Sequence, residues 1–187
     1  MWKSFPIFLQ RQDMNDIYAI DEYSLFRNDS TSTCGMRHFG GKAVYSRVDY
    51  YPGYPYCHNT NGVEITVLRF LNLPHVTIIG VYCSPRVPLR QLCVALSELL
   101  DQPLSRTNIV IGDLNVNWCI ETERASLYNL FARNNYKQLV SCSTTDTKTC
   151  TCMDHVYTNP PATYVNLPIL ERYFSDHKGV CALVDSF

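Results

Sequence analysis

IVIGDLN, residues 109–115, is an apolar run that ends in a glycine followed by a carboxylate and an amide. The run is rich in β-branched residues and is typical of a buried strand. Because an unpaired carboxylate is costly to bury, we expect Asp113 and Asn115 at the exit of this strand. At that position water, a cation or a substrate can reach both side chains.

Further strand-like runs lie on both sides of this segment. Before it stand YSLFR (23–27), KAVYSRV (42–48), EITVLRF (64–70) and VTIIGVY (76–82), and after it YKQLV (136–140), MDHVYTN (153–159), YVNLPIL (164–170) and GVCALVDSF (179–187). β-branched and aromatic residues, which favour strands, are frequent in these runs. The turn-forming residues NLPH between the runs at 64–70 and 76–82 predict a hairpin.

Two segments carry the spacing of amphipathic helices. Leucines recur every three or four residues in LRQLCVALSELLD (89–101) and define one apolar face. A second helix is predicted in TERASLYNLFARNN (122–135), starting at Thr122 as an N-cap residue and ending near Asn134. Strands mixed with two such helices predict an α/β (α+β) layered fold, and the 187 residues suffice for one domain, 1–187.

Composition and charge narrow the classes of protein to which the chain can belong. A hydrophobic fraction of 46% with 18% charged residues predicts a folded globular protein rather than a disordered one. The formal net charge of −1 provides no overall attraction to nucleic acid, so any phosphate binding has to come from a local site. The longest apolar stretch is too short to span a bilayer, and we expect no membrane partner.

Cysteine usage and the N-terminal segment indicate a reducing compartment. The nine cysteines are an odd number without a regular spacing, which favours free thiols over a disulfide scaffold. A proline interrupts the short apolar run within residues 1–13, and no small-residue cleavage motif follows, so no signal peptide is expected. We therefore expect an intracellular protein, and a nuclear location is compatible with the sequence.

Three short motifs place acidic, amide and imidazole groups beside apolar runs: GDLN (112–115), MDH (153–155) and SDH (175–177). Each motif alone is common, and its ordinary interpretation is a capped turn. The occurrence of all three in this order indicates instead that they contribute to one site.

With their flanking residues these motifs resemble the endonuclease/exonuclease/phosphatase family of metal-dependent phosphodiesterases. The segments that carry the resemblance are FRNDS…FGGKAVYSR (26–47), IIGVYCSP (78–85), IVIGDLN (109–115), MDHVYTN (153–159) and YFSDHKGV (173–180). They are most similar to the apurinic-type endonuclease domains of non-LTR retrotransposons, from about residue 17 to the C-terminus. The resemblance implies a four-layered α/β sandwich of two packed, mainly antiparallel sheets flanked by helices.

The resemblance also implies a reaction and its partners. The reaction is hydrolysis of a phosphodiester by an activated water, assisted by Mg²⁺ or Mn²⁺, and the expected substrate is DNA. Magnesium prefers hard oxygen ligands and keeps several waters, so a few carboxylates suffice. We expect a DNA-nicking endonuclease domain of retrotransposon origin, monomeric by itself or part of a longer polyprotein with a reverse transcriptase.

Four side chains would perform the central steps if the resemblance extends to the site. Asp113 would align the attacking water, and Asn115 would hold that water or a phosphate oxygen. His177 would contact the scissile phosphate. Asp154 would accept a hydrogen bond from the His177 ring, keep the ring oriented and raise its pKa.

Two further side chains complete the expected site. Asp176 resembles a carboxylate that binds the metal directly or from the second sphere, and its ordinary alternative is a turn acid. Tyr82 matches a tyrosine that reaches the phosphate, although a tyrosine at the end of a buried strand is also common packing. The motifs assign no role to His155 or Ser175, which we expect to pack and to cap a turn.

The first part of the family pattern has no match in this sequence. In the family, a strand ending in Asn and a strand ending in a metal-binding Glu precede the first matched segment. Residues 1–13 contain no Glu, and Glu22 falls too late. We therefore expect a domain without these N-terminal strands, with an unpaired sheet edge and a reduced affinity for magnesium.

Three alternatives to an active DNA nuclease follow from the same sequence. In the first, the chain is a catalytically inactive remnant or fragment of a mobile-element polyprotein. In the second, it is a phosphatase or phosphodiesterase of the same fold that acts on a small phosphorylated molecule. The segment FGGKAVYSR favours DNA over the small molecule. The third alternative is a structural zinc site formed by Cys142, Cys150, Cys152 and His155, although their spacing is irregular for such a site.

Overall fold

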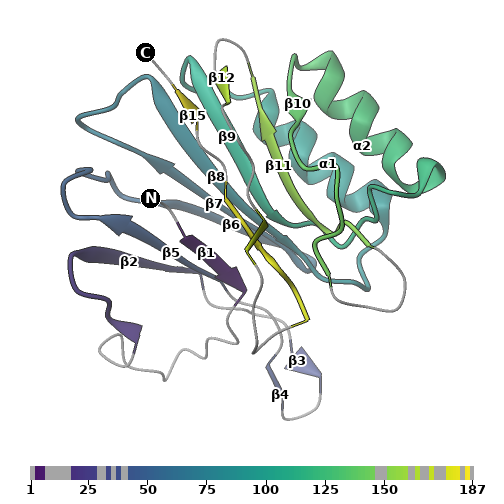
Figure 1. Cartoon of the computed structure of the whole chain (residues 1–187), viewed down its shortest axis with the longest axis horizontal. Coiled ribbons are helices and arrows are strands. Elements are labelled where there is room, and N and C mark those ends of the chain that lie inside the picture. Colours follow the sequence, from purple (N-terminus) through teal and green to yellow (C-terminus); the bar gives the residue numbers. More distant parts are fainter. Residues whose placement is uncertain are drawn as a thin grey trace.

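The computed structural model describes residues 3–6, 18–28, 33–34, 37–38, 42–145, 151–159, 163–164, 169–170, 176–181 and 184–185. In these residues the chain forms two packed sheets, with helices α1 and α2 on the outer face of the larger one (Figure 1). This α+β sandwich confirms the fold class expected from the sequence. No helix in the described ranges is long and apolar enough to cross a membrane.

The larger sheet contains six strands in the order β10-β11-β9-β8-β7-β6. They are β6 (Tyr56–Thr60), β7 (Val63–Arg69), β8 (Val76–Cys83), β9 (Thr107–Asp113), β10 (Lys137–Gln138) and β11 (Asp154–Thr158). Neighbouring strands are antiparallel except β8 and β9, which are parallel. A parallel pair needs a crossover connection, and α1 (Leu89–Leu100) supplies it.

One face of the larger sheet packs against the helices. The leucines on the apolar side of α1 are buried against β7, β8 and β9, as their helical spacing predicts. Helix α2 (Glu121–Arg133) adds Phe131, whose ring stacks on Tyr157 of β11 with the centroids 3.5 Å apart. This layer is the main core of the domain.

The smaller sheet covers the opposite face of the larger one. Its antiparallel strands lie in the order β1 (Lys3–Pro6), β5 (Lys42–Arg47) and β2 (Tyr23–Asn28). Val44 of β5 packs with Leu68 and Ile78 of the larger sheet. Short antiparallel pairs are also present: β3 (Thr33–Cys34) with β4 (Arg37–His38), β12 (Thr163–Tyr164) with β15 (Val184–Asp185), and β13 (Ile169–Leu170) with β14 (Gly179–Val180).

Two predictions based on hydrophobic periodicity and turn residues are confirmed, and a third needs a correction at a helix start. The β7–β8 hairpin and α1 lie where the sequence places them. Helix α2 begins at Glu121 after Ile120, without a side-chain cap, so the expected N-cap residue Thr122 lies inside the first turn. The carboxylates of Glu121 and Glu123 in this turn favour that start by their interaction with the helix dipole.

The sequence pattern does not predict β1 and β6. Strand β6 is an edge strand with mostly exposed or half-buried side chains, so it lacks apolar alternation. The turn Asn61-Gly62 sets its pairing with β7, because both residues have positive φ, 49° and 87°, as a two-residue hairpin turn requires. Of the predicted strands at 164–170 and 179–187, residues 165–168, 182–183 and 186–187 lie outside the described part of the chain.

Candidate active site

Residues 112–115 leave β9 through a turn that restricts the residues able to form it. Gly112 has φ 153°, and a Cβ there would lie 1.7 Å from the carbonyl oxygen of Val81. Asn115 has φ 50°, a left-handed value that asparagine adopts more readily than most residues. The turn brings the Asp113 carboxylate to the end of the sheet, where the residue is 8% exposed.

Hydrogen bonds within this turn hold Asp113 and Asn115 side by side. Oδ1 of Asp113 accepts from the backbone N–H of Asn115 at 3.0 Å, and Oδ2 accepts from its Nδ2 at 3.2 Å. The same Nδ2 donates to the carbonyl oxygen of Cys83 at the end of β8, at 2.7 Å. The capped turn is therefore present, and it fixes the carboxylate against the neighbouring strand.

Polar side chains form one row across this end of the larger sheet. The register pairs Asn59 with Glu64, Glu64 with Tyr82, Tyr82 with Asp113, and Asp113 with Asp154. Directly paired residues point to the same face of a sheet, and here that face meets the smaller sheet. We call these five residues the polar row.

His177 is joined to the last member of the polar row. Its Nδ1 lies 2.9 Å from Oδ2 of Asp154, and the two side chains are 25% and 18% exposed. The hydrogen bond to Asp154 raises the pKa of His177 to about 9, although burial opposes the shift. At neutral pH the ring is therefore protonated, donates from Nδ1 to Asp154 and carries a second donor at Nε2.

Thr144 organises the backbone on both sides of this pair. Its Oγ1 accepts from the N–H groups of Met153 and Asp154 at 3.0 and 3.1 Å. Its carbonyl oxygen accepts from the N–H of Lys178, the residue after His177, at 2.7 Å. This fully buried residue thus connects the strand that carries Asp154 to the segment that carries His177.

Negative charge accumulates at this end of the sheet. The pKa of Asp113 is raised to about 6, first by burial and then by the carboxylate of Asp154, with a smaller contribution from Asp176. Burial, followed by Asp113 and Glu64, raises the pKa of Tyr82 to about 12. Tyr82 therefore keeps its phenolic proton at neutral pH, and Asp113 is a weaker acid than an ordinary aspartate.

The structure brings the side chains selected from the sequence to one end of the sheet. They are Asp113, Asn115, Asp154, His177, Tyr82 and Asp176. Tyr82 is half-buried beside Asp113, and Asp176 is exposed just before His177. A bridge between Thr145 and His177 fixes the latter segment to the loop that carries Thr144.

Sequence reasoning did not select Glu64 and Asn59, the other two members of the polar row. Glu64 is 3% exposed, and it stands inside the run VEITVLR, where it resembles the polar face of a half-buried strand. Asn59 lies on the unpredicted strand β6. The glutamate within a strand-like run was the only local signal, and its position in the row depends on pairing between distant segments.

His155 is a core histidine, as its lack of a motif role suggested. Its Nε2 lies 2.8 Å from the carbonyl oxygen of Val116 and its Nδ1 lies 2.8 Å from the Tyr157 hydroxyl, and burial lowers its pKa to about 4. Both nitrogens are engaged, so His155 is not available to zinc. No group of three His, Cys, Asp or Glu among the described residues is arranged to hold a metal. Cys150 and Ser175 lie outside those residues.

Comparison with known proteins identifies the fold. No family model and no curated protein sequence matches the chain. An endonuclease/exonuclease/phosphatase family protein from Leptotrichia buccalis matches over 91% of this chain and 75% of its own, with a TM-score of 0.68 and 14% identity. The chain has the endonuclease/exonuclease/phosphatase fold.

Two nucleic-acid enzymes share this endonuclease/exonuclease/phosphatase fold with the chain. The endonuclease domain of TRAS1, a telomere-specific non-LTR retrotransposon, has a TM-score of 0.61 and 17% identity, over 86% of this chain and 77% of its own. D. rerio TDP2 complexed with a single-strand DNA product has a TM-score of 0.62 and 16% identity, over 88% and 78%. At these identities the likeness shows the fold.

The donor set is compatible with the divalent ion that the endonuclease/exonuclease/phosphatase fold implies. The carboxylates of Asp154 and Asp176 both raise the pKa of Asp113, which shows that negative charges repel one another here. Carboxylate oxygens suit Mg²⁺ and Mn²⁺, and Mg²⁺ is commonly held by one or two carboxylates, waters and substrate phosphate. Asp176, exposed beside His177, fits such an open site rather than an all-protein cage.

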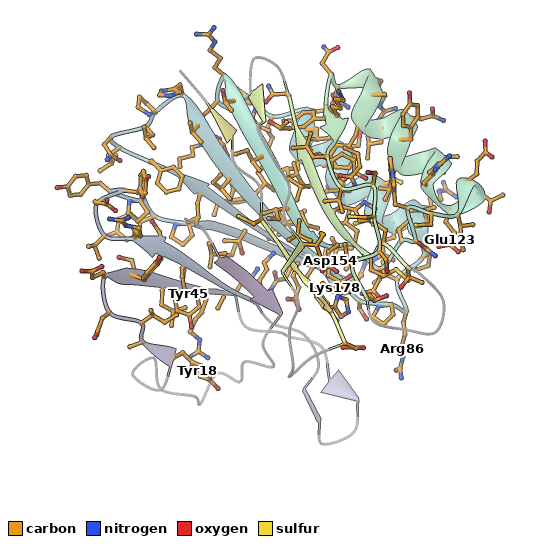
Figure 2. The ribbon with its side chains drawn as sticks, in the orientation of Figure 1. Tyr18, Tyr45, Arg86, Glu123, Asp154 and Lys178 are labelled. Atoms are coloured by element: carbon orange, nitrogen blue, oxygen red, sulfur yellow. The ribbon has the colours of Figure 1, made fainter. Side chains whose placement is uncertain are left out.

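Two cationic residues follow members of this acidic site along the chain: Lys178 comes after His177, and Arg86 follows β8, which carries Tyr82. Figure 2 shows Asp154 and Lys178 near the middle of the view and Arg86 extending outward below them, whereas Tyr18 and Tyr45 lie on the side of the smaller sheet. Arg86 is exposed in the loop between β8 and α1. An acidic centre flanked by cations suits a phosphate-bearing ligand together with a metal ion.

Proposed function

We propose that the chain is a metal-assisted phosphodiester hydrolase that nicks DNA. The observation that carries the proposal is the convergence of Asp113, Asp154 and His177, which come from β9, β11 and the segment before β14. In-line hydrolysis needs a base for the attacking water and donors for the charge that develops on the phosphate. The three side chains have the chemistry for both tasks.

In this proposal Asp113 aligns and activates the attacking water. Its pKa of about 6 lies near neutral pH, where a general base is both deprotonated and strong enough to accept a proton. Asn115 restrains both oxygens of the carboxylate and thereby fixes the direction of attack. Its Nδ2 hydrogens are donated to Asp113 and to the Cys83 carbonyl oxygen, so the additional role that we assign to the Asn115 amide is to orient the attacking water through Oδ1; holding a phosphate oxygen would need one of these hydrogens to change partner.

The phosphate would bind between His177 and Tyr82. His177, kept protonated by Asp154, donates to a non-bridging oxygen and stabilises its developing charge. Tyr82 retains its proton and offers a second donor from the adjoining strand. Mg²⁺ or Mn²⁺ held by Asp176 would neutralise further negative charge on the phosphate when bound.

DNA is the preferred substrate in this proposal. Lys178 follows His177, and Arg86 lies in the loop after β8, which carries Tyr82, so both cations would contact a nucleic-acid backbone bound at the site. The TRAS1 domain is described as an endonuclease of a retrotransposon, and TDP2 is described in complex with a DNA product. Together with the similarity of FGGKAVYSR to the retrotransposon class, these observations support an endonuclease domain of that origin.

A small phosphorylated molecule is the second candidate substrate. Glu64 and Asp113 are only 3% and 8% exposed, and carboxylates this buried are reached more readily by a small phosphate group than by a duplex. A mannosyl-6-phosphatase from Bacteroides thetaiotaomicron has the same fold, with a TM-score of 0.62 and 11% identity.

Two assays on the same protein samples test the proposal and separate the substrates. Supercoiled plasmid and p-nitrophenyl phosphate are each incubated with Mg²⁺ and wild-type protein, Asp113→Ala or His177→Gln. Asp101→Ala is the matched control, because Asp101 is an exposed aspartate at the end of α1. We expect nicking by the wild type and the control, and none by the two site variants.

Other outcomes favour the alternatives. Ester hydrolysis that the two site variants lose, without plasmid nicking, would replace DNA by a small phosphorylated substrate. Wild-type protein that performs neither reaction with Mg²⁺ or Mn²⁺ would refute the proposal and favour the inactive remnant.

A further inference from the structure

Lys42 places an ammonium group in the interior between the two sheets. It is the first residue of β5 and is 2% exposed, although burying an ammonium group without partners is costly. Its Nζ donates to the carbonyl oxygen of Gly80 at 2.8 Å and to that of Glu64. These carbonyls belong to β8 and β7, so Lys42 extends from the smaller sheet to the larger one, next to the polar row.

Asn28 of the adjoining strand β2 reaches the same region. Its Nδ2 donates to Oδ1 of Asn59 at 2.8 Å, and Nδ2 of Asn59 donates to Oδ1 of Asn28 at 2.7 Å. Asn28 also donates to Oγ1 of Thr66 at 3.3 Å. Polar contacts therefore join the sheets at the Glu64 end of the row, but amides and hydroxyls carry no net charge, and among these groups Lys42 supplies the positive one.

Glu64 connects Lys42 electrostatically to the Tyr82 side of the row. Burial lowers the pKa of Lys42 to about 7, and the Glu64 carboxylate acts in the opposite direction. The same carboxylate contributes to the raised pKa of Tyr82, after burial and Asp113. Glu64 therefore interacts with a buried cation on one side and with the Tyr82 phenol on the other.

A phosphate group that enters this site meets several carboxylates. Glu64, Asp113 and Asp154 share the row, and Asp176 lies close enough to raise the pKa of Asp113. Buried charges are screened much less than exposed ones, so Glu64 and Asp113 act most strongly on a bound anion. Without a positive charge nearby, Glu64 would repel a phosphate held by Tyr82.

We propose that Lys42 is the internal counter-charge of Glu64 and that it thereby sets the affinity of the polar row for a phosphate group. The inference rests on the proposed function, because it requires a phosphate beside Tyr82 and His177. Lys42 is a positioning residue here: it acts through Glu64 and does not touch the substrate. The recognised ligand class is a phosphate-bearing molecule, for which inorganic phosphate is the simplest probe.

Phosphate titrations of charge variants test this inference. The dissociation constant is measured by NMR at the Asn115 side-chain amide, at about pH 6, where the Lys42 ammonium is charged, with and without Mg²⁺. Lys42→Met keeps most of the length of the side chain, removes its charge and is expected to weaken phosphate binding about tenfold. Glu64→Gln should strengthen binding about threefold, and the double variant should lie within about twofold of wild type.

Matched controls make the same charge changes at exposed positions. Lys137→Met removes a positive charge on β10, and Glu98→Gln removes a negative charge on α1. Both should bind phosphate as the wild type does, because exposed and distant charges are screened.

Two results would overturn the inference. The first is a phosphate affinity of Lys42→Met equal to that of wild type. The second is a double variant that binds phosphate as weakly as Lys42→Met does, and this result would mean that Lys42 has a purely structural role. If Lys42→Met does not fold, Glu64→Gln decides, since tighter binding supports the inference and unchanged binding overturns it. Wild-type protein that binds no phosphate would refute the proposed function itself, and the inference with it.

Discussion

Asp113 and Asp154 lie directly opposite each other on the antiparallel strands β9 and β11. Like charges in directly opposed positions destabilise a sheet. The repulsion is evident in the pKa of Asp113, which burial and then Asp154 raise to about 6. A neutral or oppositely charged partner would stabilise this position more, so the pairing of two carboxylates is better explained by a role in a site than by folding.

Asp113→Asn is expected to stabilise the fold at neutral pH while abolishing hydrolysis. The pKa of Asp113 is raised from 3.8 to about 6 in the folded state, so ionisation of this carboxyl destabilises folding. The destabilisation is absent below about pH 4, grows as pH rises to about 6 and is complete above that value. Unfolding midpoints of variant and wild type should therefore coincide in acid and separate at neutral pH. A variant less stable than wild type at neutral pH would contradict this assignment.

Asp154→Asn should lower the pKa of His177 toward its ordinary value of 6.5, because the hydrogen bond to Asp154 is the main cause of the rise to about 9. A raised histidine pKa stabilises the fold below about pH 6.5, and this contribution is lost as pH rises to about 9. NMR titration of the His177 ring measures the shift. An unchanged titration in the variant would show that the ion pair does not control the charge of His177.

Thr144→Val is expected to lower both hydrolysis and the pKa of His177. The substitution keeps the shape of the side chain but removes the acceptor for the N–H groups of Met153 and Asp154. Displacement of such a supporting contact commonly reduces activity about tenfold or more. Activity and the His177 titration are measured together, and Thr144→Ser should retain both.

Thr77→Val is the matched control for this effect. It also removes a buried threonine hydroxyl, which donates to Oγ of Ser105 at 2.7 Å, but at the opposite end of β8 from Tyr82. It should lower stability without changing His177. Equal effects of Thr77→Val and Thr144→Val on the His177 titration would show that general destabilisation is responsible.

Gly112→Ala should prevent stable folding, whereas Gly80→Ala should be tolerated. A Cβ on Gly112 would overlap the carbonyl oxygen of Val81 at 1.7 Å, and φ 153° is unfavourable for alanine. A Cβ on Gly80 would meet its nearest neighbour, Val44, at 3.7 Å, an ordinary contact. Thermal unfolding should show a loss of more than about 4 kcal/mol for Gly112→Ala. Similar midpoints for the two variants would contradict the turn geometry.

Hydrophobic spacing and turn residues predicted the helices and hairpins whose pattern lies within one continuous segment. The leucines of α1 and the two apolar strands around NLPH are examples, because their periodicity and turn residues are contained in one segment. The predicted start of α2 was wrong. The helix begins at Glu121, where the first-turn carboxylates interact favourably with the helix dipole, and Thr122 is not its N-cap. Strand β1 was not predicted, because its pairing with β5 joins segments far apart in sequence.

The same distinction applies to the candidate site. The motifs GDLN, MDH and SDH marked Asp113, Asp154 and His177 because each stands beside an apolar run. Glu64 belongs to no motif, and Lys42 stands in FGGKAVYSR without a role assigned to it, so each resembles an ordinary strand residue in sequence. Their burial and their proximity follow from the packing of one sheet on the other, which no single segment encodes.

The most direct test of the hydrolytic site compares plasmid nicking by wild-type protein and by Asp113→Asn. The unfolding midpoints of both samples are measured first. A rate at least about 100-fold lower in the variant is expected, together with a midpoint at neutral pH that is equal to or above that of wild type. Equal nicking rates in two folded samples would contradict the hydrolytic role of the Asp113, Asp154 and His177 cluster.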